Sequence, residues 1–250
     1  GNTFSNDTLS MIPDKGVSTF IKNLSDVSAK SVSNHFNLYY MNDWKNGWRM
    51  NAYGDYLHKT DRSRGNICEW ESDRTETSMD YYRKADWDLF AAKFSLSYET
   101  EKAGVFNLGY DFSHTSGTDY IEYVRALNNG RTHNTEMKNS VYLSYDYTWK
   151  NLSLGAGLRY EQIRSELRET HDNKTQYQTY HNFLPSVSLS YNTEKLQQSL
   201  AYSIHTERPP FDVMNDNAVY TDRFTYQKGN LYLKQALTHD LNYMLFYKFL

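Results

Sequence analysis

The stretch "VYLSYDYTWKNLSLGAGL", residues 141–158, alternates large apolar side chains with small or polar ones and breaks once, at Lys150 and Asn151. A period of two is the signature of a β-strand, because successive side chains leave a pleated strand on opposite faces. The break contains turn-forming residues, so the stretch predicts a β-hairpin. The apolar face of this hairpin consists of Val141, Leu143, Tyr145, Tyr147 and Trp149, followed by Leu152, Leu154, Ala156 and Leu158.

The opposite face of the hairpin is polar or small, and two environments fit this pair of faces. In the first, the apolar face packs on a protein core and the polar face contacts water. In the second, the apolar face contacts lipid and the polar face lines a wet interior. The polar face consists of Ser144, Asp146, Thr148, Ser153, Gly155, Gly157 and Arg159.

The composition favours strands with one apolar face over a helical bundle. Of the 250 residues, 23 are Tyr and 16% are aromatic, whereas only 39% are hydrophobic and the mean hydropathy is -0.80. Apolar content is therefore thin and concentrated in amphipathic rings. No stretch approaches the roughly 18 to 20 consecutive apolar residues of a membrane helix, but a barrel strand requires only about 9 to 11 residues of alternating pattern.

Charge and motifs exclude several functional classes. The formal net charge is -3 and no run of Lys or Arg stands out, which argues against a nucleic-acid surface. Cys68 is the only cysteine, so the chain has no intrachain disulfide and no multi-cysteine metal site. The histidines lack metal-ligand spacing, and no nucleophile elbow or glycine-rich phosphate loop occurs. We therefore predict no catalytic residue, no metal, no cofactor and no nucleic-acid partner.

The same alternation recurs along residues 1–250 and predicts one all-β unit, an antiparallel up-and-down meander of about nine strands. Residues 1–33 lack the pattern, and we predict a loop or irregular lead-in there. The predicted strands span about 34–42, 47–58, 87–99, 104–113, 137–149, 152–165, 177–191, 196–205 and 237–250.

The connections between these strands alternate in length. Short turns on one rim and long loops on the other are the construction of outer-membrane barrels, in which the long loops are extracellular. Trp and Tyr also gather beside the short turns, as in an interfacial girdle. This pattern favours lipid on the apolar face. The short turns lie at 42–47, 99–104, 150–151 and 192–195, and the long segments at about 59–86, 114–136, 166–176 and 206–236.

The segment "NFLPSVSLSYNTEKLQQSLAYSIHTERPPFDVMN", followed by "YQKGNLYLK", resembles the C-terminal barrel of TonB-dependent receptor-like outer-membrane proteins, often fused to a carboxypeptidase-regulatory-like domain. The resemblance covers about residues 183–249. It departs from the family pattern at Leu231, Gln235 and Ala236, where Pro, Pro and Glu are usual. The matching positions are Leu184, Pro185, Ser186, Tyr202, Ser203, Arg208, Pro209, Gly229, Asn230, Leu233 and Lys234.

The resemblance implies an outer-membrane importer that takes up a nutrient such as a siderophore, a glycan or a peptide. Such barrels have about 22 strands, so this chain would form a partial segment of one. The resemblance also implies contact with outer-membrane lipid. A plug domain and a TonB-type energy-transducing protein are expected as partners outside residues 1–250.

Two groups of residues are candidate sites. The first is a set of loop positions for ligand binding, because exposed rings among polar residues suit sugar, peptide or siderophore capture, although the rings could equally pack the loops. The second is a set of lumen-facing polar residues that could line a solute path, hold a plug by charge pairing, or form only a salt-bridge ladder. The loop set is Trp70, Tyr81, Tyr82, Trp87, Arg208 and Phe211, and the lumen set is Asp111, Asp146, Arg159 and Glu161.

Two alternative functions remain open from the residues alone. One is a self-contained small β-barrel or lipocalin-like module, in which Leu143, Tyr145 and Tyr147 would line a ligand cavity. The other is an adhesin whose long loops bind a host or matrix partner.

Overall fold

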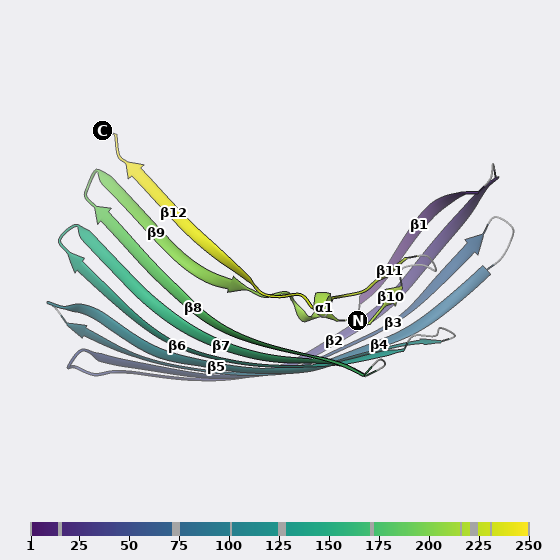
Figure 1. The fold of residues 1–250 in the computed structure, drawn as a ribbon, viewed down its shortest axis with the longest axis horizontal. Coiled ribbons are helices and arrows are strands. Elements are labelled where there is room, and N and C mark those ends of the chain that lie inside the picture. Colours follow the sequence, from purple (N-terminus) through teal and green to yellow (C-terminus); the bar gives the residue numbers. More distant parts are fainter. Residues whose placement is uncertain are drawn as a thin grey trace.

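The computed structural model describes residues 2–14, 17–71, 76–100, 102–124, 129–170, 173–215, 217–220, 225–230 and 232–249. Ten antiparallel strands form one sheet in the order β1-β2-β3-β4-β5-β6-β7-β8-β9-β12, which curves like a trough (Figure 1). The strands are β1 (Asn2–Asp14), β2 (Val17–Asp43), β3 (Trp48–Glu71), β4 (Glu76–Thr100), β5 (Gly104–Val124), β6 (Gly130–Trp149), β7 (Leu152–Glu169), β8 (Lys174–Asn192), β9 (Leu196–Glu207) and β12 (Ala236–Tyr247).

Three short elements connect β9 to β12. They are the single helical turn α1 (Phe211–Met214) and the two-residue strands β10 (Val219–Tyr220) and β11 (Tyr226–Gln227), which pair with each other. This segment lies over the concave side of the trough (Figure 1). Among the described residues, no helix has the length and apolarity needed to cross a bilayer.

The predicted all-β meander is confirmed, and the nine predicted strands are β2–β9 and β12. The predicted irregular lead-in over residues 1–33 is wrong, because β1 and most of β2 occupy it and pair from Asn2↔Ala29 to Asp14↔Val17. Sequence alternation missed this hairpin because backbone hydrogen bonds hold it together. Every residue type except proline can both donate and accept such bonds, so they leave no side-chain pattern.

The short turns lie where the sequence predicts them, and two of them depend on glycine. Gly47 and Gly104 have φ of 86° and 81°, a left-handed conformation that glycine adopts at low cost. The long segments differ from the prediction. Among the described residues, those predicted as loops within 59–86, 114–136 and 166–176 extend the strands, whereas those within 206–236 are mostly irregular. The extensions escaped detection because their convex side carries polar residues, so the apolar alternation stops where the strands continue.

The apolar residues of the alternation lie on the convex face. Leu143 is 57% exposed there, while the opposite face contacts the segment between β9 and β12 through Asp119 and Tyr123. The apolar face therefore lies on the outside of the trough, and the polar face lines its inside. This arrangement contradicts the lipocalin-like alternative, in which Leu143, Tyr145 and Tyr147 would line the cavity.

The apolar surface forms a belt of limited height. On the convex face of β7, apolar and aromatic residues run from Leu152 to Tyr160, and Gln162 and Arg164 follow. The apolar stretch therefore extends over about nine residues of strand before polar side chains begin on the convex face, the length expected of a transmembrane β-strand. We call this surface the apolar belt.

We predict that Leu143→Arg lowers the stability of the membrane-inserted protein by about 2 to 4 kcal/mol, because it places a charge in the apolar belt. The matched control is Ser144→Arg, one residue away on the polar face, with an expected change below about 1 kcal/mol. Urea titration of the full-length protein in lipid vesicles measures both. Equal losses for the two variants would contradict the assignment of faces.

Candidate functional site

The concave face carries a buried polar cluster where the segment after β9 contacts the sheet. Asp119 on β5 is 3% exposed and accepts two hydrogen bonds from Arg83 on β4, at 3.0 Å from Nε and 2.7 Å from the second guanidinium nitrogen. The Asn215 amide also donates to Asp119, and Thr132 on β6 donates to Asn215 Oδ1 at 2.9 Å. The bidentate geometry fixes Arg83, and the shared carboxylate fixes the segment to the sheet.

Apolar contacts hold the same segment down. Phe211 of α1 stacks on Trp87 of β4 with ring centroids 5.5 Å apart, and Met214 packs with Leu167 of β7 and Leu233. Trp87 lies over Gly117, where an added Cβ would come 2.2 Å from the indole ring. Glycine at 117 is therefore needed for this position of the indole.

Tyrosines fix the next part of the segment. The Tyr123 hydroxyl donates to the Ala218 carbonyl at 3.1 Å and accepts from the Tyr220 N–H at 3.0 Å. Tyr81 of β4 packs against Tyr123 at 5.8 Å between ring centroids. Both rings lie beyond the apolar belt, and burial raises the pKa of the Tyr123 hydroxyl, which therefore stays a neutral donor.

A pocket of about 520 Å³ opens between this cluster and strands β2, β3 and β4. Its polar lining includes two ion pairs, Lys59–Asp61 at 2.8 Å and Arg83–Asp119 at 2.7 Å, and Lys30 and Arg62 also line it. Its aromatic lining is Trp87 with Phe211. Opposed ion pairs and a ring wall suit a ligand with many hydrogen-bonding groups and one apolar surface.

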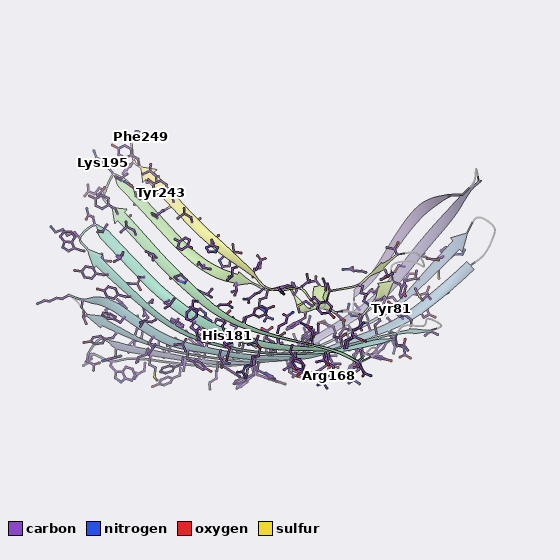
Figure 2. All side chains as sticks on the ribbon, in the orientation of Figure 1. Tyr81, Arg168, His181, Lys195, Tyr243 and Phe249 are labelled. Carbon is purple, nitrogen blue, oxygen red and sulfur yellow. The ribbon has the colours of Figure 1, made fainter. Side chains whose placement is uncertain are left out.

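The structure divides the predicted ligand-binding set. Trp87 and Phe211 meet at the pocket, and Tyr81 lies on the same concave side (Figure 2). Trp70 and Tyr82 lie on the convex side, where Tyr82 stacks with Arg64 at 5.7 Å from the ring centroid. These residues were predicted in a loop but lie on β3 and β4, and residues an odd number apart on a strand face opposite sides.

Arg208, the remaining member of the predicted ligand set, lies at the start of the segment and forms an ion pair with Glu136 of β6. Both side chains are largely buried, at 19% and 17% exposure. Arg208 therefore fastens the segment to the sheet, and it is not among the residues that line the pocket.

Three of the four predicted lumen-facing residues form one network. Arg159 lies 2.6 Å from Asp111 and 3.7 Å from Glu161, and Lys138 lies 3.3 Å from the buried Glu161 carboxylate. Asp146 lies apart and accepts a hydrogen bond from Asn107 at 3.4 Å. The network pairs its charges internally, which satisfies a polar lumen. Its role in solute passage or plug contact stays a prediction.

Sequence reasoning missed Arg83, Asp119 and Asn215. The concave parity of β5 does continue from Asp111 to Asp119, eight residues later, and this was the available signal. Asn215 carried no signal, because its position depends on how the irregular segment folds back. Within the described ranges, no group of three His, Cys, Asp or Glu residues is placed to hold a metal.

The sequence profile described as the outer membrane protein beta-barrel family matches residues 45–250. No curated protein matches the chain.

Two solved structures are similar in fold. The ferric citrate transporter FecA in its unliganded form has a TM-score of 0.49 and 13% identity, over 76% of this chain and 36% of that chain. The alcaligin outer membrane receptor FauA from Bordetella pertussis has a TM-score of 0.49 and 12% identity, over 97% of this chain and 47% of that chain. The chain thus spans less than half the length of either structure.

We predict that Asp119→Ala destabilises the docked segment by about 3 kcal/mol, because it leaves Arg83 and Asn215 without their shared acceptor. Limited proteolysis of the full-length protein should then cut within 208–235 at least tenfold faster. Lys84→Ala is the matched control, since the Lys84–Asp86 pair is more exposed and lies on the opposite face. Such an exposed pair contributes about 0 to 1 kcal/mol. Unchanged cleavage of the Asp119 variant would contradict the docking role.

Proposed function

Because the chain belongs to the outer membrane protein β-barrel family, we propose that it forms part of the barrel of a TonB-dependent receptor-like importer. In this proposal the barrel binds a nutrient, such as a siderophore, a glycan or a peptide, and takes it up. A plug domain and a TonB-type energy-transducing protein would act with it. Family membership itself places the chain in the outer membrane and argues against an enzyme, as the sequence predicts.

One observation carries the proposal: the strands continue well past the apolar belt and enclose a polar pocket on the concave side. On β4, the convex apolar residues end at Phe90, and the pocket residues Arg83, Ala85 and Trp87 follow on the inner side. A wall that served only to span lipid would not need these extensions. Their inner surface supports capture of a solute before it enters the lumen.

The docked segment supports the same proposal. It narrows the trough from the concave side and supplies Phe211 and Asn215 to the pocket lining. Ion pairs and amides anchor it at several points, so a ligand in the pocket would contact barrel wall and segment together. The lumen network of Asp111, Arg159 and Glu161 would then line the path below the pocket or hold the plug.

The first experiment has two stages, which test the outer-membrane barrel and then the importer activity. The full-length native protein, expressed in its own host, should float with outer-membrane fractions and show heat-dependent mobility on a gel. Uptake of labelled siderophores, glycans and peptides should then be compared with and without the TonB-type energy-transducing protein. Uptake that depends on that protein supports the importer. Binding without energy-dependent uptake of any probe would overturn it in favour of an adhesin.

We predict that the double variant Trp87→Ala, Phe211→Ala weakens binding of the transported probe at least tenfold, because two adjacent aromatic anchors are lost. Tyr82→Ala is the matched control on the convex side, and it should change the Kd less than twofold. Equilibrium binding to the purified protein measures both. A larger loss in the Tyr82 variant than in the double variant would move the ligand site off the concave face.

A further inference from the structure

Four tyrosines on the convex face repeat one hydrogen-bond arrangement. Each lies on an ascending strand near the upper margin of the apolar belt, and its hydroxyl contacts a polar side chain on the neighbouring descending strand. In each case the partner lies one diagonal step across the hairpin. The four pairs are Tyr56–Asp88 at 2.7 Å, Tyr110–Asn139 at 2.7 Å, Tyr160–His181 at 2.8 Å and Tyr202–His239 at 2.9 Å.

The strand registers place these tyrosines on a line that descends across the sheet in two steps of four residues. Phe90, the partner of Tyr56, pairs with His114, so Tyr110 on β5 lies four residues closer to the short turns. Tyr160 shares the row of Tyr110 through Val141.

The last step repeats the first. Tyr202 pairs with Val187 and Val187 with Ala156, so Tyr202 lies four residues below the row of Tyr160. Eight residues over the six steps from β3 to β9, at about 3.3 Å per residue and 4.8 Å between strands, give a slope of about 40°. Strands of outer-membrane barrels tilt by about 35 to 45°. The tyrosines therefore lie close to one height in the membrane, at the outer margin of the apolar belt.

The Tyr160–His181 pair differs from the others in its surroundings. Arg164 lies two positions beyond Gln162, the register partner of His181, so His181 and Arg164 are neighbours on the convex face. Both side chains are exposed. The nearby Glu166 carboxylate is held by Arg168 at 2.7 Å, and in the described part of the chain no carboxylate lies within ion-pair distance of Arg164. This location therefore has a free guanidinium beside a histidine, at the level of lipid headgroups.

The tyrosine also orients the histidine. When the Tyr160 hydroxyl donates to Nδ1 of His181, the ring proton lies on Nε2, which becomes a donor. An acceptor-only group is what a ring N–H and a guanidinium fit, and Arg binds phosphate with two N–H groups at once.

We propose that Arg164 and His181 bind the phosphate of an outer-leaflet lipid headgroup. This inference rests on the outer-membrane family and not on the importer proposal. The other three pairs lack this combination: Asp88 is an anion, Asn139 is neutral, and His239 is flanked on its own strand by Leu237 and Leu241. The phosphate site therefore belongs to the β7–β8 hairpin, and the remaining pairs mark the height of the interface.

The test uses the full-length protein reconstituted in phosphatidylcholine vesicles that contain diphosphoryl lipid A. Native mass spectrometry measures lipid A retained after mild detergent extraction. We expect the double variant Arg164→Gln, His181→Gln to retain about tenfold less lipid A, because two donors to one phosphate are lost. Tyr160→Phe should lose less, since His181 is then present but not oriented.

The matched control is His114→Gln, which removes a convex-face histidine that has no tyrosine partner among the described residues, and it should retain lipid A as the wild type does. Heat-dependent mobility confirms insertion of each variant, and Arg164→Gln alone serves if the double variant does not insert. Equal retention in wild type and double variant would overturn the proposal. Displacement of lipid A by inorganic phosphate at the same concentration would also overturn it, in favour of a free-anion site. Nutrient uptake is measured separately. A protein that retains lipid A but takes up no nutrient would contradict only the importer proposal.

Discussion

The sheet of this protein depends on one constraint: inside hydrocarbon no water can satisfy a backbone N–H or C=O, so each strand must pair with its neighbour along its whole buried length. The ten-stranded ladder meets this constraint in continuous antiparallel register. Once the backbone is paired, the odd or even position of a residue along its strand decides whether its side chain faces lipid or the interior. The apolar belt on the convex face and the charged network on the concave face follow from this alternation.

The interior has a second constraint, because charges that face a confined lumen need partners. Arg159 meets this by bridging Asp111 and Glu161, and Arg83 by binding Asp119 through two nitrogens. The second pair also recruits the segment after β9, since Asn215 donates to the same carboxylate. Charge satisfaction and the shape of the pocket are thus produced by the same contacts.

The side chains of the convex face match the dimensions of a bilayer. The length of the apolar belt, the turn chemistry on one rim and the slope of the tyrosine pairs come from different residues, and they describe the same tilted wall. Each pair gives a tyrosine hydroxyl a hydrogen-bond partner. The apolar ring can therefore contact lipid while its hydroxyl is satisfied at the edge of the hydrocarbon. One of the four pairs, at His181, lies beside an arginine with no carboxylate partner among the described residues, and this supports a local role in holding lipid.

The sequence by itself determined the strands within the lipid, the short turns and the parity of each side chain, because alternation is a local property that two different solvents impose. It also placed Trp87 and Phe211 among the ligand candidates. Only the tertiary structure decided that the strands continue to residues such as Val124 and Glu169, since backbone pairing beyond the lipid leaves no apolar pattern. It alone decided that Trp70 and Tyr82 face away from Trp87, and that Asn215 reaches Asp119. Those contacts join residues far apart in the chain, and local pattern contains no information about distance in space.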